Sequence, residues 1–409
     1  MKIIADLHIH SKYARATSKN SDLDGLSEWG KIKGIDVLAT GDITHPKWVL
    51  ELKSNLKELE NGLYEYKGQK FILSGEIALF YKVNQESKRI HLVILSPSIE
   101  ITLQINDQLG KYARLDYDGR PIISMQPAEL IQILMNISED IFIIPAHIWT
   151  PWFSLFGSKS GVDIIEDAFE DQTKNIYALE TGLSSDLEMN WMLSKLDKYS
   201  LVSNSDSHSP QKIGREANVF NLLEVSYHSL INAIKTKKGF EKTYEFYPEE
   251  GKYHFDGHRN CNIIFSPAQS KIHKNKCPVC KKELTIGVMN RVYELADREY
   301  GFKPENSINS KKIVPLTVLI SKILKKSEIS RKVSEEYFKL VRYFGSEFAV
   351  YEAEKEKLNL STTPEIANAI NLVNLGKIYW TPGYDGVFGE LSFEKKSEQK
   401  QSQKNLFDF

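Results

Sequence analysis

The sequence has little cysteine and no long apolar stretch. Its 409 residues include three cysteines, Cys261, Cys277 and Cys280, which lie within 20 residues of one another. In a reducing compartment, cysteines this close together favour a metal site over disulfides. No apolar run is long enough to cross a bilayer, and the first residues lack the apolar core and cleavage site of a signal peptide. We therefore expect a cytoplasmic protein with no membrane partner.

The sequence also lacks an overall charge, but its charges are unevenly distributed. The formal net charge is −1, of which residues 1–250 carry −8 and residues 251–409 carry +7. An acidic part can hold cations, whereas a basic part can hold a polyanion. Charge varies along any chain, but this asymmetry favours a nucleic acid as the partner of the second part. The length allows two or three domains.

Histidines and carboxylates recur where predicted strands end in residues 1–240. Seven short apolar runs alternate with helical patterns, which predicts an α/β fold. These runs cover residues 2–5, 35–40, 71–75, 89–95, 141–146, 177–181 and 200–204. The polar set consists of His8, His10, Asp42, His45, Glu76, His91, His147, Asp206 and His208. Most members follow a strand, as in the site of an α/β barrel. His91 lies inside its strand, where a hydrogen-bonded core histidine is the alternative.

This set of side chains predicts a metal centre. Imidazole and carboxylate ligands suit zinc, manganese or iron. Nine such groups are too many for one tetrahedral ion, so a polynuclear site with Glu76 as a bridge fits better. We expect Zn²⁺ there, with Mg²⁺ or Mn²⁺ as alternatives. Such a centre activates water for attack on a phosphoester. His8, His10, Glu76 and Asp206 would be catalytic because they hold the ions.

The cysteines belong to a second predicted metal site. His258-x2-Cys261 and Cys277-x2-Cys280 form two knuckles separated by 15 residues. This spacing is typical of a structural Cys₃His zinc site, which contributes folding energy and leaves no open position for chemistry. His254 and His273 lie near, but only His258 repeats the two-residue spacing.

The basic part of the chain, after the cysteines, is predicted to form helices and loops. Residues 288–300 predict one amphipathic helix and residues 315–344 predict two more. These carry Lys325 and Arg331, for which DNA phosphates are the expected partner and a solvated face is the alternative. The segment 381–389 contains Tyr384 and Phe388 and is rich in glycine. It could stack on an unpaired base, or it could form a tight turn that packs its own aromatic rings.

The last residues form a polar segment that we expect to be a flexible tail. It ends in a peptide with Gln403, Leu406, Phe407 and Phe409. This peptide resembles the motif that binds sliding clamps, in both its archaeal and its bacterial versions, and could dock into a groove. The alternative is an ordinary amphipathic terminus.

The histidine and carboxylate motifs resemble those of the PHP (polymerase and histidinol phosphatase) superfamily. The resemblance implies a distorted seven-stranded α/β barrel that holds three metal ions and hydrolyses phosphoesters. It implies one ion at His8, His10, Glu76 and Asp206, and a second at Glu76, His91 and His147. A third would lie at His208 with Asp42 or His45. One motif departs from the family pattern: Thr-Asp-His is usual, whereas this chain has Gly41-Asp42-Ile43-Thr44-His45.

Over nearly its whole length the chain resembles the endonuclease Q family. The motifs are Asp256-Gly257-His258-Arg259-x-Cys261, Cys277-Pro278-Val279-Cys280, Glu294-Leu295-Ala296-Asp297-Arg298 and Pro382-Gly383-x-Asp385-Gly386-Val387-Phe388-Gly389. The resemblance implies a DNA repair endonuclease that nicks damaged DNA 5′ to uracil, hypoxanthine, xanthine or abasic sites. Such an enzyme must extrude the damaged nucleotide. Trp149, Trp152 and Phe153, which follow His147, are candidates for lining its pocket.

These inferences combine into one domain plan. Residues 1–240 would form the PHP barrel, 241–290 the zinc module, 291–393 a helical and loop DNA-binding region, and 394–409 the tail. The partners would be damaged double- or single-stranded DNA and a sliding clamp, and the protein would be associated with the nucleoid. Two alternatives remain: a small-molecule phosphatase of the histidinol phosphate type, and a DNA-binding scaffold without catalysis.

Overall fold

The computed structural model of the protein describes residues 1–395. Eleven strands form one mixed sheet. Eight of them follow the order β15-β12-β11-β1-β2-β5-β4-β3. In addition, β7 pairs with β5, and β6 pairs with both β5 and β8. The strands of this sheet are β1 (Lys2–Asp6), β2 (Val37–Ala39), β3 (Lys57–Glu58), β4 (Tyr64–Tyr66), β5 (Gln69–Val83), β6 (Glu86–Ser96), β7 (Ile122–Ser124), β8 (Phe142–Pro145), β11 (Ala217–Asn221), β12 (Phe240–Glu245) and β15 (Asn309–Lys312).

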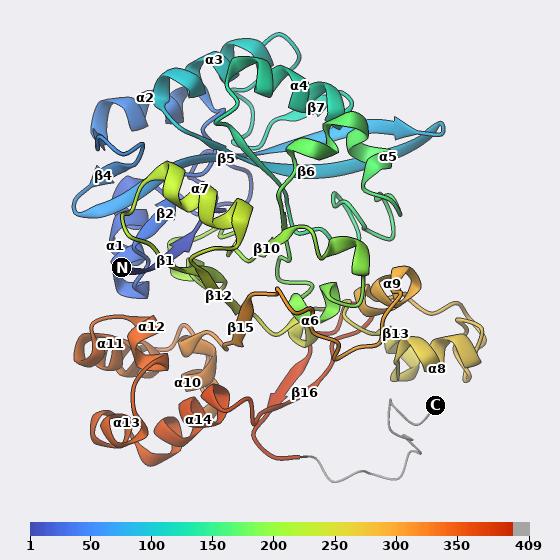
Figure 1. Cartoon of the computed structure of the whole chain (residues 1–409). Helices are drawn as coiled ribbons and strands as arrows, with labels where there is room; N and C mark the ends of the chain where they lie inside the picture. Colours follow the sequence, from blue (N-terminus) through green and yellow to red (C-terminus); the bar gives the residue numbers. More distant parts are fainter. Residues whose placement is uncertain (396–409) are drawn as a thin grey trace.

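Helices cover this sheet along the chain. In Figure 1, α2, α3 and α4 lie along the top of the sheet, above β5. The helices of the first part are α1 (Leu23–Lys33), α2 (Pro46–Asn55), α3 (Ile99–Leu109), α4 (Pro127–Ile137), α5 (Glu166–Phe169), α6 (Leu187–Asn190) and α7 (Tyr227–Thr236). Helix α1 is capped by Asp22, whose side chain accepts from Gly25 N, and ends at Gly34, which has φ 86°.

The predicted α/β class is confirmed, but a closed barrel ladder is not seen among residues 1–395. The strands β9 (Ala178–Glu180) and β10 (Ser200–Val202) form a separate parallel pair. Single contacts join this pair to the main sheet: Ile148 N donates to Glu180 O at 3.0 Å, and Ile9 forms an isolated bridge with Ser207. The structure is therefore a mixed α/β fold with a central sheet.

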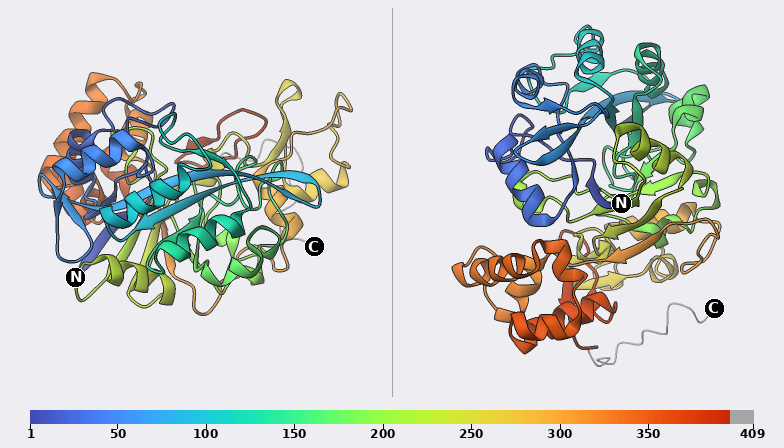
Figure 2. Two further views of the ribbon diagram at one scale, coloured as in Figure 1. Left: turned by 90° about the horizontal axis from the view of Figure 1, so that it is seen from above. Right: turned by 60° about the vertical axis from the view of Figure 1, so that its left-hand side comes forward.

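The remaining part forms two groups of elements beneath the sheet, the helices α10–α14 at the lower left of Figure 1 and β13 with α8 at the lower right. In the right-hand view of Figure 2, the helices α10–α14 form a separate cluster below the sheet. The elements are β13 (Asp256–His258), β14 (Ile263–Phe265), α8 (Pro267–Ile272), α9 (Val288–Leu295), α10 (Leu316–Leu324), α11 (Arg331–Phe344), α12 (Glu347–Tyr351), α13 (Lys355–Ser361), α14 (Pro364–Asn374), β16 (Tyr379–Thr381) and β17 (Glu390–Ser392).

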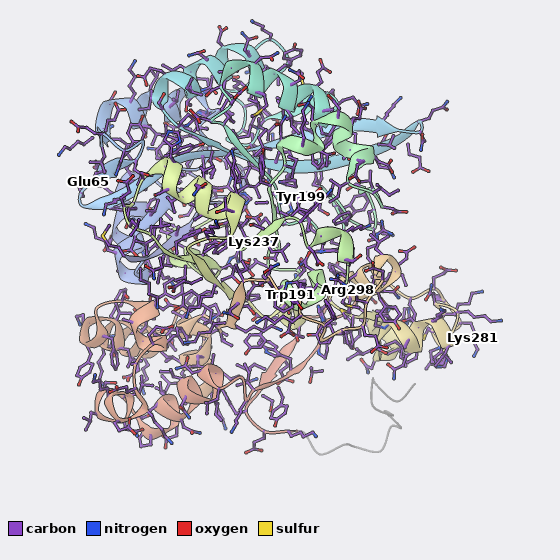
Figure 3. The ribbon with its side chains drawn as sticks, in the orientation of Figure 1. Glu65, Trp191, Tyr199, Lys237, Lys281 and Arg298 are labelled. Carbon is purple, nitrogen blue, oxygen red and sulfur yellow. The ribbon has the colours of Figure 1, made fainter. Side chains whose placement is uncertain are left out.

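The second part is fastened to the first at several points. β15 pairs in parallel with β12 and so belongs to the main sheet. Lys33 of α1 and Glu347 of α12 form a buried ion pair with 2.5 Å between Nζ and Oε2. Burial raises the pKa of a carboxyl, but Lys33, together with the hydrogen bonds from Leu316 N and Tyr337, outweighs burial and lowers the pKa of Glu347. Arg298 binds Asp197 with its two terminal guanidinium nitrogens, Nη1 and Nη2, at 2.9 and 2.6 Å, beside Trp191 (Figure 3).

Within residues 1–395, none of the helices combines the length and the apolar character that crossing a bilayer requires.

Candidate metal centre

Backbone pairing brings the two ends of the predicted site together. His10 N donates to Ser207 O, and Asp206 N donates to His8 O, both at 2.9 Å. The residues after β1 therefore run beside those after β10. Alternate residues of an extended chain share a face, so His8 and His10 lie on one side. The pairing brings Asp206 and His208 next to them. Asp6 fixes this junction, since its carboxylate accepts from Ser205 N and Gly214 N at 3.0 Å each.

Sheet register places the next two donors. Glu76 pairs with Val93, and Ala78 pairs with His91, in the antiparallel ladder of β5 and β6. Glu76 and His91 are therefore diagonal neighbours on one face of the sheet, with 2.8 Å between Glu76 Oε1 and His91 Nδ1. His147 follows β8, and its Nε2 lies 3.1 Å from the same carboxylate oxygen.

The ligand-type atoms form three adjacent groups, in each of which they lie within 4.8 Å of one another. Glu76 belongs to two groups and His10 to two. The groups are His8, His10 and Glu76; His10, Asp206 and His208; and Glu76, His91 and His147. Three groups that share members are the arrangement expected for a centre with more than one ion.

The donor atoms in these groups fit metal ions. His8 Nε2, His10 Nε2 and Asp206 Oδ1 are buried and have no hydrogen-bond partner. His10 Nε2 lies 3.2 Å from Asp206 Oδ1 and 3.3 Å from Glu76 Oε2. Bonds of about 2.1 Å to a metal place neighbouring ligand atoms roughly 3 Å apart. Buried polar atoms normally have a hydrogen-bond partner. Because these three atoms have none and lie close together, we infer that bound cations are their partners.

Two further carboxylates orient the imidazoles. His10 Nδ1 donates to Asp42 at 2.9 Å, and His8 Nδ1 donates to Glu180 at 3.1 Å. In each ring this leaves the Nε2 lone pair free for an ion. Glu180 also accepts from His147 N and from Asn204, both at 2.8 Å. Sequence reasoning missed Glu180, although it lies near the end of the predicted strand 177–181.

The structure brings His208 into the centre with His10 and Asp206, and not with Asp42 or His45. Asp42 contacts His10 and also accepts from Ser11 N and Ser11 Oγ, at 2.6 Å each, so its oxygens are engaged as a support. The His45 ring instead stacks on Tyr13, with 4.3 Å between the ring centroids. His45, the displaced histidine of the motif Gly41-Asp42-Ile43-Thr44-His45, therefore lies outside the three donor groups.

The centre concentrates opposite charges in a buried space. Burial lowers the pKa of an imidazole, but Glu180, Glu76 and Asp206 outweigh burial and raise the pKa of His8 to about 9. Burial raises the pKa of a carboxyl, yet the imidazoles around Glu76 hold its pKa well below the usual range. For His91 burial prevails and lowers the pKa to about 4. A cation that binds here competes with the protons on these rings.

Arg120 is a second residue that sequence reasoning missed. Its Nη1 donates to Glu76 Oε2 at 3.1 Å. Burial lowers the pKa of an arginine, but Glu76, together with Asp206 and Asp118, outweighs burial and raises the pKa of Arg120. A fixed positive charge therefore stands beside the shared carboxylate, where the negative charge of a phosphoester would arrive.

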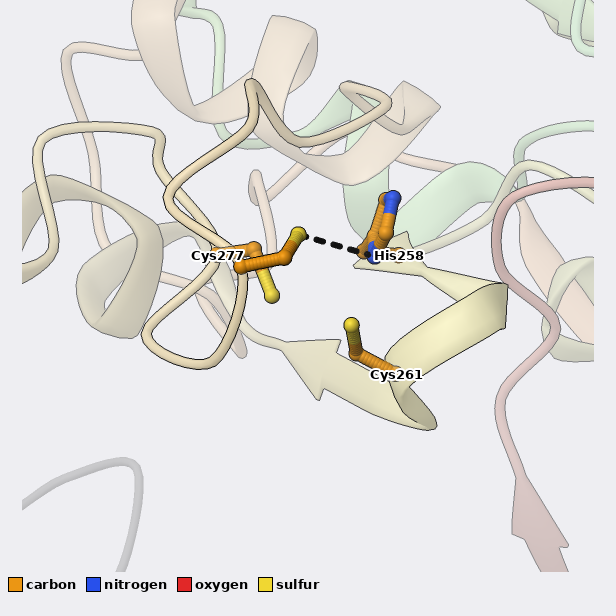
Figure 4. Close-up of side chains that lie close together, drawn as sticks. His258, Cys261 and Cys277 are labelled. Atoms are coloured by element: carbon orange, nitrogen blue, oxygen red, sulfur yellow. Dashed lines mark hydrogen bonds between the residues drawn. The ribbon is translucent and has the colours of Figure 1, made fainter.

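The cysteine cluster forms a compact group in the second part. His258, Cys261, Cys277 and Cys280 each offer an atom within 4.8 Å of the others, and His258 Nδ1 lies 3.7 Å from Cys280 Sγ (Figure 4). Zinc–sulfur bonds of about 2.3 Å in a tetrahedron separate the sulfur atoms by roughly 3.8 Å. The four residues therefore fit one zinc ion, and His254 and His273 lie outside the group.

The glycine-rich segment near residue 385 forms a tight turn. Tyr384 and Val387 exchange backbone hydrogen bonds of 3.0 and 2.8 Å, and Asp385 and Gly386 both have positive φ, 42° and 84°. This is the pattern of a type I′ turn. Asp385 accepts from Arg259 N and Thr285 Oγ1, at 2.8 and 2.6 Å, which fastens the turn to the segment that carries the cysteine cluster.

The predicted DNA-contacting residues differ in their exposure. The prediction that Trp149 lines a lesion pocket is wrong. Trp149 is 1% exposed, and its indole N–H donates to Asn190 at 2.8 Å in the core. Tyr384 is likewise buried, and its side chain lies against Gly257 of β13. Trp152 and Phe388 are 55% and 64% exposed.

The other candidates occupy three different settings. Phe153 packs on His91, with 4.9 Å between the ring centroids, and has φ 60°, which is strained for a bulky residue. Lys325 caps the C-terminal end of α10. Arg331 begins α11 and pairs with Glu335 at 2.7 Å. Gln403, Leu406, Phe407 and Phe409 lie outside the described residues.

The fold and the centre define a metal-dependent hydrolase. No family model matches the chain. The lesion-specific endonuclease PfuEndoQ from Pyrococcus furiosus is 30% identical and superposes with a TM-score of 0.87 over 98% of both chains. A structure of endonuclease Q with a 27-mer duplex substrate bearing an abasic lesion at the active site is also 30% identical. Its TM-score is 0.85, and the match covers 98% of this chain and 99% of that one.

Two uncharacterized proteins are also similar. One from Bacillus subtilis is 29% identical over 95% of this chain and 99% of its own length. One from Methanocaldococcus jannaschii is 33% identical, but the match covers 60% of this chain and 31% of that protein. The chain belongs to the endonuclease Q family. It is therefore an endonuclease and a metal-dependent hydrolase, as the sequence analysis expected.

Proposed function

We propose that the protein is a DNA repair endonuclease that hydrolyses the phosphodiester 5′ to a damaged nucleotide. The observation that carries the proposal is the set of three adjacent donor groups in a chain that matches endonuclease Q over 98% of its length. Deaminated bases (uracil, hypoxanthine and xanthine) and abasic sites are the proposed lesions, and an abasic duplex is the substrate bound by the similar structure.

In the proposed reaction, residues of the chain hold the metal ions and orient the metal ligands. Metal ions bound at the centre would lower the pKa of a water molecule and neutralise charge on the phosphoryl oxygens. His8, His10, Glu76, His91, His147, Asp206 and His208 are the proposed ligands. Glu180 and Asp42 fix the ring orientation of His8 and His10. Arg120 adds a positive charge beside Glu76, which favours an approaching phosphate.

The rest of the chain is proposed to hold the DNA. The main sheet and the β9–β10 pair would act together as a distorted PHP-type barrel. Exposed Trp152 and Phe388 can contact an extruded or unpaired base, and Phe153 supports the ligand His91. Lys325 and Arg331 can contact phosphates. The Cys₃His module would hold a structural zinc ion, and the tail would bind a sliding clamp, which places the enzyme near the nucleoid.

The proposal is tested with end-labelled duplexes that carry one uracil, hypoxanthine or abasic site. We expect a nick 5′ to the lesion with the wild-type protein and a divalent metal, and none on undamaged duplex. Asp206→Asn is the inactive control, because it removes a buried carboxylate oxygen of the centre. Hydrolysis of free phosphomonoesters without any nick would favour the phosphatase alternative. Binding without any hydrolysis would favour the scaffold.

Glu180 provides a further prediction about the same reaction. Glu180→Gln keeps the shape but weakens the acceptor of the His8 Nδ1 proton. Loss of such supporting carboxylates typically costs about 10- to 100-fold in activity or metal affinity, and we expect a loss of nicking activity in that range. Glu166→Gln, on the surface helix α5, is the matched control and should nick at the wild-type rate. Wild-type activity and metal content in Glu180→Gln would show that His8 needs no support.

A further inference from the structure

A cavity of about 410 Å³ opens beside the metal centre, between the segment after His10 and the loop joining α3 to β7. Its walls include Arg15, Tyr117, Arg120 and Ile122. Arg120 connects it to the centre, because this residue lines the cavity and also donates to Glu76 at 3.1 Å. None of the sequence motifs described above lies in it.

The loop that forms one wall is firmly held. Asp118 Oδ1 accepts from Arg15 N at 3.1 Å and from Arg120 N at 3.2 Å. One buried carboxylate therefore fixes the backbone of both arginines. Gly119 lies against Asp42, where a Cβ would come within 2.4 Å of the carboxyl carbon. The spacing between this wall and the metal centre is thus set by direct packing.

The cavity presents cationic and aromatic groups together. The Arg15 guanidinium carbon lies 4.3 Å from the centroid of the Tyr117 ring, over its face. The Tyr117 residue is still 63% exposed, and Ile122 is 54% exposed. The Arg15 side chain is 60% exposed, and its ion pair with Asp118 is long, at 3.7 Å. Arg114, also in the wall, is paired with Asp116 at 3.1 Å.

We propose that this cavity is a nucleotide subsite for the residue next to the cleaved phosphodiester. The Arg15 guanidinium would bind a flanking phosphate, and the exposed surface of Tyr117 and Ile122 would support a base by stacking and apolar contact. Arg120 links the subsite to the centre, and Asp118 is a positioning residue. The inference rests on the proposed function, because it assigns the cavity to the same DNA strand.

Steady-state nicking of an abasic duplex tests the subsite. Tyr117→Ala and Arg15→Ala should each raise KM about tenfold with little change in kcat, because the contacts lie outside the centre. Arg15→Lys should recover part of the loss, since it keeps the charge. Tyr177→Ala removes another partly exposed tyrosine, on the segment before β9, and should leave KM unchanged. Unchanged KM in both Tyr117→Ala and Arg15→Ala would overturn the subsite.

A binding readout separates this inference from the proposed reaction. Duplexes with 2-aminopurine on either side of the abasic site are mixed with the full-length Asp206→Asn protein. We expect a fluorescence change at one of the two positions, and Tyr117→Ala in the same background should abolish it. If that change appears while wild-type protein nicks nothing, the subsite stands and the proposed reaction fails. If wild-type protein nicks but neither position responds to Tyr117→Ala, the subsite fails alone. Thermal unfolding confirms that each variant is folded.

Discussion

Replacing Glu76 with glutamine is expected to lower the kcat for phosphodiester cleavage by about a thousandfold or more. Both oxygens of this carboxylate are engaged. Oε1 lies 2.8 Å from His91 and 3.1 Å from His147, and Oε2 lies 3.3 Å from His10 and 3.1 Å from Arg120. Glutamine has the same shape, but it carries no charge and turns one acceptor into a donor. Two of the three donor groups would lose their shared member.

The measurement pairs activity with metal content. Glu76→Gln should bind fewer ions per chain by elemental analysis while its thermal unfolding stays cooperative. Glu86→Gln is the matched control, because Glu86 lies at the far end of the same hairpin with its side chain 75% exposed. That variant should keep wild-type activity and metal content. Full metal content and activity in Glu76→Gln would refute the bridging role of Glu76.

The sequence was most informative where one local pattern decides the structure. His8-x-His10 follows an apolar strand, and the alternation of an extended chain is enough to place both rings on one side. For the glycine-rich segment 381–389 a tight turn was one of two open alternatives, and the Asp385-Gly386 pair suits it because both positions of a type I′ turn need positive φ. In each case the determining contacts lie within a few residues of one another, so no knowledge of the tertiary fold was needed.

Sequence reasoning was weaker where distant residues meet. The predicted strand 71–75 extends in fact to Val83, because β5 pairs with β6 along its length. This pairing decides that Glu76 and His91 share a face. Arg120 lies in the loop between helix α3 and strand β7. That loop follows no predicted strand and an arginine is not a metal ligand, so no sequence pattern singled it out. Asp42 was a candidate ligand, and only its 2.9 Å contact with His10 Nδ1 identifies a supporting role.

The segment that carries the cysteine cluster, the proposed zinc module, is connected to the metal centre's side of the molecule by a chain of specific contacts. Asp256 of β13 accepts from Gly287 N, at the start of α9, at 2.7 Å. Arg291 of α9 donates to Phe156 O at 3.1 Å and pairs with Asp163. The loop that Arg291 holds follows the proposed ligand His147 and carries Trp152 and Phe153. If this segment loses its fold, the loop with Trp152 and Phe153 should therefore also lose its fixed position.

Cys277→Ser is expected to remove one equivalent of zinc and to weaken binding of abasic duplex at least tenfold. Cys277 is buried, and a structural zinc site supplies on the order of 10 kcal/mol to the folding of isolated zinc-finger peptides. Without the ion, the turn at Asp385 loses its anchors at Arg259 and Thr285. Val279→Ser alters an exposed residue of the same knuckle and should keep both zinc and affinity. Cys277→Ser with full zinc content would show that Cys277 is no ligand. Loss of zinc with unchanged affinity would show that the module does not position the DNA-binding surface.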